Sequence, residues 1–209
     1  ERLIVNDRDE RLSSARAADA DALVSTFDAV LADNRFADFV LPLCRAGRAR
    51  GLPVVLDGDR STVATDALLA ACTHVIFAAD GLRATAERDD LADGLRCIAS
   101  RTDAFLAVTD GERGTLWLEQ GRVRTLPAFR INTVDTLGAG DVFHGAAALA
   151  LAEGRATVDA LLFASAAAAV KCTRFGGVRG ASTRAETEAL MRRDGQGGGP
   201  TESELRGRM

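Results

Sequence analysis

Short, continuous apolar runs alternate with longer stretches of helical periodicity along the chain, and this alternation limits the possible folds more than any other feature. Four apolar runs are predicted as strands, at Asp28–Ala32, Leu52–Leu56, His74–Phe77 and Ala104–Val108. Helices are predicted between them, at Ala37–Arg50, Thr62–Ala71 and Asp89–Ser100. Buried strands separated by helices are typical of βαβ units, in which helices cover both faces of a parallel sheet. The sequence therefore predicts an α/β fold with a mostly parallel central sheet.

A different pattern follows the last of these strands. Gly114–Glu119 and Arg122–Leu126 flank Gln120-Gly121, and this arrangement predicts a β-hairpin. Two alanine-rich helices are predicted next, at about Asp141–Glu153 and Thr157–Arg174. Their low polarity indicates close packing against the sheet.

The chain is expected to form one domain. We assign residues 1–192 to this domain and interpret the Gly-rich, charged residues 193–209 as a disordered tail. A strand fragment is predicted at Leu3–Val5, and Glu1 stands where an initiator methionine would be expected. These features predict that the chain lacks an N-terminal part.

The composition excludes several classes of protein. Lys plus Arg number 26 against 30 Asp plus Glu, and the net charge of −4 argues against a nucleic-acid binder. No apolar stretch is long enough to cross a membrane. Lys171 is the only lysine, and its setting in Ala-Val-Lys-Cys excludes a P-loop, which needs Gly-Lys followed by Ser or Thr. Four cysteines without a Cys-x-x-Cys pair predict reduced thiols and a cytoplasmic protein.

One predicted loop has the composition of a ligand site. Ligands of open α/β sheets bind beyond the carboxyl ends of the strands. Val134–Asp141 reads Val-Asp-Thr-Leu-Gly-Ala-Gly-Asp and leads directly into a helix. Gly138 and Gly140 permit unusual dihedral angles and a close approach of the backbone to a ligand. The free N–H groups and the dipole of a helix N-terminus favour an anion at this position.

Asp141 falls in the first turn of that helix. A carboxylate repels a phosphate, but it can take the proton from a hydroxyl that attacks a phosphoryl group. The same spacing is equally typical of an aspartate that caps a helix after a glycine turn. On spacing alone, both interpretations stay open. His144 lies three residues further on, where it either modulates Asp141 or, as we expect, packs beneath the loop.

Three motifs in the same order resemble those of the ribokinase-like PfkB family of carbohydrate kinases. Asp135–Asp141 with the following Val-Phe-His-Gly resembles the family's C-terminal signature, and Val108–Gly114 resembles its Thr-x-Gly-x-x-Gly nucleotide segment. Phe163–Ala169 with Cys172–Gly177 resembles its Ala-rich helix and the loop beyond. The opening Glu-Arg-Leu-Ile-Val-Asn and the later Leu-Ala-Asp-Asn-Arg are most similar to the ketohexokinase and sulfofructose kinase branch. The resemblance implies a three-layer α/β/α ribokinase-like fold.

The resemblance also implies an activity, the transfer of the γ-phosphoryl group of Mg²⁺-ATP to a hydroxyl of a fructose-like sugar or sulfo-sugar. Asp141 would be the catalytic base on the sugar hydroxyl. The backbone N–H groups of Gly138, Ala139 and Gly140 would form the anion hole for the transferred group. The resemblance is also compatible with a homodimer, but the sequence does not specify the oligomeric state, because dimerisation in this family often runs through the lid.

Other residues gain roles in binding from the same resemblance. Thr109, Gly111 and Gly114 would border the nucleotide, and Ser165 would lie where the Ala-rich helix touches adenosine. Asp135 would belong to a loop that binds a monovalent cation such as K⁺. An alternative role for Asp135, equally compatible with the sequence, is to fix the glycine loop by hydrogen bonds.

The chain departs from the family pattern in two places. Many members carry an Asn-x-x-Glu motif after a central strand, whereas this chain has Ala78–Gly81 there, with only Asp80 as a replacement. The region that holds the family's Gly-Gly motif, most sugar contacts and the lid is missing. Two alternatives therefore stay open, a nucleoside or small-alcohol kinase of the same superfamily and a non-catalytic sugar- or nucleotide-binding relative.

Arg35 is the candidate for contact with the substrate. It follows Asp33-Asn34 at the end of a predicted strand. Arginine presents a planar fork of donors that suits a sulfonate, carboxylate or phosphate group. The competing interpretation is a surface arginine that pairs with Asp33 or Asp38.

Overall fold

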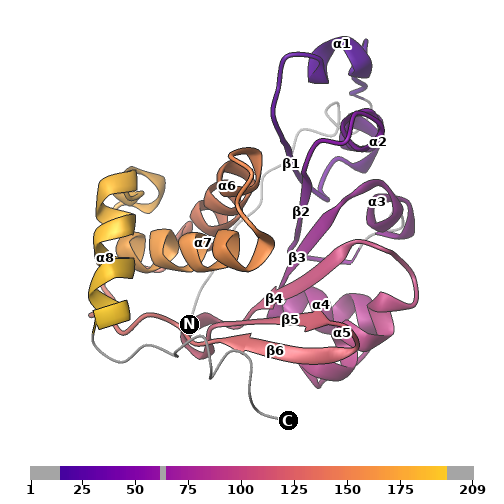
Figure 1. Ribbon diagram of the computed structural model, residues 1–209. Helices are drawn as coiled ribbons and strands as arrows, with labels where there is room; N and C mark the ends of the chain where they lie inside the picture. Colours follow the sequence, from indigo (N-terminus) through magenta and orange to yellow (C-terminus); the bar gives the residue numbers. More distant parts are fainter. Residues whose placement is uncertain (1–14, 62–64, 197–209) are drawn as a thin grey trace.

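The computed structural model of the protein describes residues 15–61 and 65–196. The strand predicted at Leu3–Val5 lies outside these residues. The described chain forms a six-stranded sheet between two layers of helices (Figure 1). The predicted three-layer α/β fold with a mostly parallel sheet is confirmed.

The six strands lie side by side in the sheet in the same order as in the sequence. Four of them run parallel, β1 Val30–Asp33, β2 Val54–Gly58, β3 His74–Ala78 and β4 Phe105–Thr109. An antiparallel hairpin of β5 Thr115–Glu119 and β6 Arg122–Leu126 continues the sheet beyond β4. Since the first four strands are parallel, their carboxyl ends meet at one edge, where Asp33 and Asp57 are partners in register.

The helices divide between the two faces of the sheet (Figure 1). Right-handed crossovers between sequential parallel strands put the connecting helices on one face. These are α2 Ala37–Ala49, α3 Thr65–Ala71, α4 Ala79–Ala86 and α5 Leu91–Ala99. The opposite layer contains α6 Ala139–Ala152, α7 Thr157–Cys172 and α8 Arg184–Gln196. A short helix, α1 Ala20–Val24, and two 3₁₀ turns, η2 Gly111–Arg113 and η3 Gly177–Gly180, complete the described elements.

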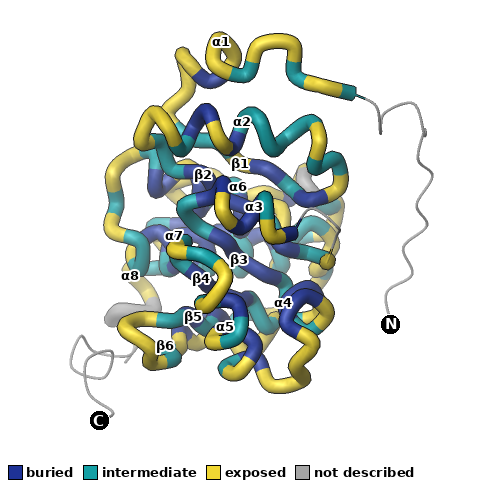
Figure 2. The backbone as a smooth tube through the Cα atoms, turned by 90° about the vertical axis from the view of Figure 1, so that its right-hand side faces the viewer, coloured by how far each residue is buried: buried dark blue, intermediate teal, exposed yellow. Residues whose placement is uncertain are grey.

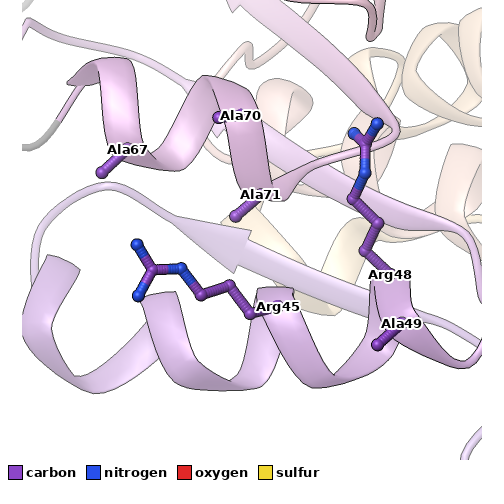
Figure 3. A pocket seen from close by; sticks show the side chains of 6 residues that line it. All are labelled: Arg45, Arg48, Ala49, Ala67, Ala70 and Ala71. Carbon is purple, nitrogen blue, oxygen red and sulfur yellow. The ribbon is translucent and has the colours of Figure 1, made fainter.

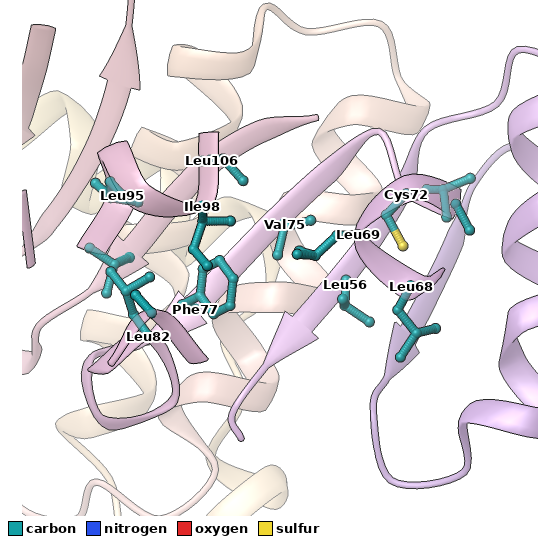
Figure 4. Packing of buried hydrophobic residues seen from close by; sticks show 14 of the residues in the cluster. Leu56, Leu68, Leu69, Cys72, Val75, Phe77, Leu82, Leu95, Ile98 and Leu106 are labelled. Carbon is teal, nitrogen blue, oxygen red and sulfur yellow. The ribbon is translucent and has the colours of Figure 1, made fainter. Parts of the chain in front are cut away.

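Alternate residues of the strands fill the two sides of the core. Val75 and Phe77 of β3 pack with leucines and isoleucine of α3, α4 and α5 (Figure 4). Val55 and Ile76 face the other way, toward α6 and α7. The central strands are buried and much of the outer surface of the helices is exposed (Figure 2). Because side chains alternate along a strand, Asp57 lies on the same face as Val55, which is the face that α6 covers.

Both boundaries of β2 differ from the prediction by two residues. β2 begins at Val54 instead of Leu52, because Pro53 has no N–H for the ladder and contributes only its carbonyl oxygen, which accepts from Val30 at 2.9 Å. The strand also continues through Gly58 instead of ending at Leu56, since its last two residues still pair with β3. The carboxyl end of β2 therefore lies two residues later than expected.

Three helices, α1, α4 and α8, were not predicted. The segment Ala78–Gly81, interpreted above as a strand end, passes directly into α4, whose N-cap residue makes no side-chain cap bond. The helix α8 extends to Gln196, so the tail predicted from residue 193 cannot begin there. The remainder of that predicted tail, residues 197–209, lies outside the described residues.

From the composition we expected no membrane span and reduced cysteines. In the described part of the chain, no helix has the length and apolar character that a membrane span requires. All four cysteines are free thiols, and Cys44 and Cys72 are buried. The free thiols agree with the expectation of reduced cysteines, and the cytoplasmic location stays a prediction.

The start of α4 packs against the end of β2 without room for a side chain. A Cβ on Gly81 would lie 2.1 Å from the carbonyl oxygen of Gly58 and 2.7 Å from the carbonyl carbon of Asp59. Both are backbone atoms, so one of the two segments would have to move. This close approach fixes the backbone at the carboxyl edge of the sheet.

Gly81→Ala is therefore expected to lower the free energy of unfolding by roughly 1–3 kcal/mol, the usual effect of overpacking. Gly145→Ala is the matched control, because a Cβ at this other helical glycine meets nothing within 4 Å. The control should be neutral or gain up to about 1 kcal/mol from the helix propensity of alanine. Urea unfolding followed by circular dichroism measures both, and equal stability of Gly81→Ala and the wild type would contradict the close approach.

Candidate active site

The loop predicted to bind an anion ends at the N-terminus of α6. Gly138 is the N-cap residue and adopts the left-handed conformation, with φ of 77°. The N–H of Ala139 donates to the carbonyl oxygen of Thr136 at 3.1 Å. Within the described residues, the N–H groups of Gly138 and Gly140 have no acceptor. Two of the three predicted anion-hole donors are therefore available to a ligand, and the third is already used.

The space beside Gly140 is open. This residue lies in the first turn of α6 with a negative φ, so the unusual dihedral angle expected at both glycines is found only at Gly138. A Cβ on Gly140 would meet no atom within 4 Å. The glycine thus leaves room next to a helix N-terminus, where an anion is favoured.

Asp141 is the third residue of α6 and is exposed. Its carboxylate forms no hydrogen bond or ion pair with any other described residue. Gly138 holds the cap position, and no side chain caps α6. The capping role that the sequence left open is therefore not found, and the carboxylate is free to act on a ligand.

Arg35 lies at the carboxyl end of β1 among three acidic residues. It donates to Asp33 at 3.2 Å and also pairs with Asp59. Burial acts to lower the pKa of Arg35, but the carboxylates of Asp59 and Asp33 outweigh it and raise this pKa. Of the two pairings considered above, the one with Asp33 is present, whereas Asp38 pairs with Arg16.

His144 connects α6 to the sheet from beneath the loop. It is buried, with 2% of its surface exposed, so the expected packing role is confirmed. Its Nδ1 lies 2.8 Å from the carbonyl oxygen of Gly140, and its Nε2 lies 3.0 Å from that of Ile76 in β3. Carbonyl oxygens only accept, so an imidazole that carries both protons donates to both of them, whereas a neutral one donates to only one.

Asp57 lies between His144 and the acidic residues of the site. Its Oδ2 is 3.6 Å from Nδ1 of His144. Burial raises the pKa of Asp57, His144 acts against this, and the nearby carboxylates of Asp59 and Asp141 raise it further. Asp57 and Asp141, from different elements, are thus electrostatic neighbours at one site.

Asp135 fixes the other end of the glycine loop. Its Oδ1 accepts from the N–H of Leu137 at 2.9 Å, and its Oδ2 accepts from those of Gly176 and Gly177 at 3.2 Å each. The buried ammonium of Lys171 lies 3.2 Å from the same Oδ2. These donors, led by the N–H of Leu137, hold the pKa of Asp135 well below its usual range. The carboxylate of Asp135 thus fixes the glycine loop by hydrogen bonds, which is the alternative role considered for this residue above.

The residues predicted to border a nucleotide have different surroundings. Gly114 is buried with φ of 96°, and a Cβ there would lie 2.1 Å from the carbonyl oxygen of Leu126, so packing alone requires glycine. Gly111 is exposed with φ of 56° and open space around it. Thr109 ends β4 and donates its hydroxyl to a β3 carbonyl at 3.3 Å, and Ser165 is half-buried in α7.

A comparison with known protein families identifies the family to which the chain belongs. Residues 6–184 match the profile described as pfkB family carbohydrate kinase. The chain belongs to the PfkB family. The resemblance stated from the three sequence motifs is thereby confirmed at the level of the family.

Individual PfkB relatives extend well beyond the matched segments. The chain is 41% identical to the ribokinase of Bacillus subtilis over 88 residues, which are 42% of this chain and 30% of that protein. It is 33% identical to fructokinase-2 of Oryza sativa over 94 residues, 42% of this chain and 28% of that protein. The crystal structure of a candidate ribokinase from Agrobacterium tumefaciens has a TM-score of 0.88 at 40% identity, and the match covers 94% of this chain and 65% of that one. The chain therefore spans less than a third of these two curated relatives and just under two thirds of that structure.

The comparisons support the family but not the predicted branch. The relatives above are named ribokinase and fructokinase, and none of them is a ketohexokinase or sulfofructose kinase. The assignment to that branch stays a prediction.

Two residues of this PfkB site were not singled out from the sequence. Asp57 was only one of several acidic residues at strand ends, and the sequence did not indicate that it would meet α6. Lys171 carried a usable signal, because a lone lysine within an alanine-rich helix must find a partner when it is buried. That signal predicts a buried ion pair without naming the acidic partner.

A separate groove of about 450 Å³ lies between α2 and α3 (Figure 3). It is lined by alanines and by Arg45 and Arg48, and Arg48 is held by Asp103 at 2.6 Å. None of the residues that line it belongs to the site at α6. The groove therefore has no part in the chemistry of that site.

His144→Leu should lower the free energy of unfolding by roughly 1–3 kcal/mol, because the carbonyl groups of Gly140 and Ile76 would lose their donor in a buried place. Leu149→Gln is the control on the same helix, since Leu149 is 47% exposed. Its effect should stay within about 0.5 kcal/mol. Urea unfolding measures both variants, and a His144→Leu protein as stable as the control would show that these two contacts do not support the loop.

Proposed function

We propose that the protein is an ATP-dependent sugar kinase that transfers the γ-phosphoryl group of MgATP to a hydroxyl of a fructose-like sugar or sulfo-sugar. One observation carries this proposal: within residues 15–61 and 65–196, the carboxylate of Asp141 has no partner and lies at the N-terminus of α6 beside N–H groups that have no acceptor. Membership of the PfkB family supports it, as does similarity to proteins named ribokinase and fructokinase.

The transfer requires one group to take a proton and others to hold developing negative charge. The carboxylate of Asp141 accepts the proton of the sugar hydroxyl while the sugar oxygen attacks the γ-phosphorus. The bond from the γ-phosphorus to its bridging oxygen breaks, and ADP leaves. The N–H groups of Gly138 and Gly140, together with the dipole of α6, stabilise the transferred group. Ala139 was expected to add a third donor, but its N–H is bonded to Thr136 and we do not assign it this role.

Magnesium belongs to the nucleotide substrate in this proposal. Mg²⁺ usually keeps several waters and is bound by phosphates with one or two carboxylates. This agrees with the finding that no three His, Cys, Asp or Glu side chains within the described residues could hold a metal together. Asp57, at the end of β2, is the carboxylate that fits this need, whereas the following Asp59 is already paired with Arg35 and Arg60. Asp80 is less suited, because it pairs with Arg83 at 3.0 Å.

We place the nucleotide along the segment after β4 and beside α7. Thr109 and Gly111 lie at the carboxyl edge of the sheet, and the open space at Gly111 would admit a close approach of the phosphates or ribose. Ser165 would contact the adenosine from α7. Gly114 would contribute by shaping the turn, as its packing indicates.

Asp141→Asn should reduce turnover by roughly 10²–10⁴-fold with little change in the KM for ATP, the usual loss when a positioned general base is removed. Asp159→Asn is the matched control, because Asp159 is also the third residue of its helix, α7, and is exposed. The control should keep wild-type turnover. Steady-state kinetics of the full-length natural protein with a sugar panel measure both. An Asp141→Asn variant with the turnover of its control would refute the proposed mechanism.

We propose that Arg35 recognises an anionic group of the substrate. Its side chain is 33% exposed at the carboxyl end of β1, the edge that α6 approaches. A guanidinium has five N–H donors, so its bonds to Asp33 and Asp59 leave others for a sulfonate or phosphate group. The two carboxylates also hold the planar fork in place, which reduces the entropy lost on binding.

Arg35→Ala should raise the KM for a sulfo-sugar or phospho-sugar by about 10-fold or more, as expected for a lost hydrogen bond to a charged group, while the KM for a neutral ketose and for ATP changes little. Arg96→Ala is the control, since Arg96 pairs with Asp93 on the surface of α5. An equal fall in kcat for every substrate would instead assign Arg35 to the phosphoryl group. Unchanged kinetics would leave it as a structural ion pair.

A further inference from the structure

Lys171 is the only lysine of the chain, and its side chain is completely buried, with 0% of its surface exposed. It lies in the last turn of α7, where its neighbours in sequence are alanines, a valine and a cysteine. An ammonium is strongly hydrated in water, so burying it is unfavourable unless nearby oxygens replace that water. The partners of this group therefore indicate what it does.

In the described part of the chain, both oxygen atoms that contact the Lys171 ammonium belong to Asp135. Nζ donates to the carbonyl oxygen of Asp135 at 2.7 Å and lies 3.2 Å from its Oδ2. The same helix end is joined to the loop by its backbone, because the carbonyl oxygen of Cys172 accepts from the N–H groups of Val134 and Asp135 at 2.8 and 3.2 Å. A positive charge on α7 thus holds the start of the glycine loop.

These contacts decide whether a monovalent cation fits the loop. The family resemblance implies such a cation at Asp135, and K⁺ binds to protein through oxygens such as those of backbone carbonyl groups. The carbonyl oxygen and Oδ2 of Asp135 already contact an ammonium, and Oδ1 accepts from Leu137. A second cation on these oxygens would lie directly against Lys171 and be repelled by it. The residues present therefore do not fit a bound K⁺ at Asp135.

We propose that the ammonium of Lys171 is a built-in replacement for this cation, so that the protein needs no added monovalent cation. Lys171 is a positioning residue in this proposal, since it acts through Asp135 on the loop that ends at Asp141. Asp135 in turn bonds the N–H of Leu137, one residue before the N-cap Gly138. The expected effect of Lys171 on turnover rests on the proposed function, whereas its expected effect on the Tm does not.

The decisive experiment compares salts on the wild-type full-length protein. The Tm and the steady-state turnover are measured in KCl, NaCl and tetramethylammonium chloride at equal ionic strength. Tetramethylammonium is too large to enter a buried oxygen site, so it reports the cation-free state. We expect the same Tm and a turnover equal within about 2-fold in all three salts. A Tm or turnover that rises in KCl relative to tetramethylammonium chloride would overturn the proposal.

Two variants test the role of the charge itself. Lys171→Ala removes the ammonium and opens space beside Asp135, so we expect a lower Tm, a turnover about 10-fold or more below wild type, and partial recovery of both in KCl or ammonium chloride. Lys171→Met fills the space without a charge and is the matched control. We expect it to be impaired without recovery in any salt.

The outcomes separate the inference from the proposed function. Two results would overturn the proposal that Lys171 replaces a cation. One is a folded Lys171→Ala protein with wild-type turnover, and the other is a Lys171→Ala protein whose Tm does not change with K⁺. If neither variant folds, the salt comparison on the wild type decides alone. A wild-type protein without kinase activity, but with a Tm indifferent to K⁺, would count against the proposed function and leave the role of Lys171 supported.

Discussion

The pairing of the buried Lys171 ammonium with Asp135 is the interaction on which the candidate site depends most. A loop that offers its N–H groups to a ligand cannot use them to hold itself in place, so it must be fixed from behind. Asp135 provides this at the start of the loop through Leu137, and His144 provides it at the end through the carbonyl oxygen of Gly140. Because His144 is buried and Asp135 is tied to the buried Lys171, the donors between these two anchors are pre-organised before any ligand binds.

The sheet contributes the second half of the site by geometry alone. Four parallel strands end at one edge, and the register sets Asp33 beside Asp57 there. Carboxylates gathered this closely repel one another, and the guanidinium of Arg35 offsets this repulsion. Among the described residues Asp141 forms no such pair, and for this reason we propose Asp141, rather than one of the paired carboxylates, as the base.

The features that could be predicted from the sequence are those that a local pattern of residues encodes. Continuous apolar runs predicted the parallel strands because a strand buried on both faces has no polar alternation, and glycine before a helix indicated the loop. α4 was missed because Ala78 passes from strand to helix without a capping side chain. α8 was missed because its residues are mostly polar. The contacts of Asp57 and Lys171 join elements distant in sequence, so spacing along the chain did not predict their partners.

The central claim is that the transferred phosphoryl group lies at the N-terminus of α6 with Asp141 on the attacking hydroxyl. A crystal structure of the full-length natural protein with ADP, a metal-fluoride mimic of the phosphoryl group and a sugar tests this directly. We expect the mimic about 2.7–3.1 Å from the backbone nitrogens of Gly138 and Gly140. We also expect a carboxylate oxygen of Asp141 about 2.6–3.2 Å from one sugar hydroxyl. A mimic bound away from α6, with Asp141 touching neither the sugar nor the mimic, would contradict it.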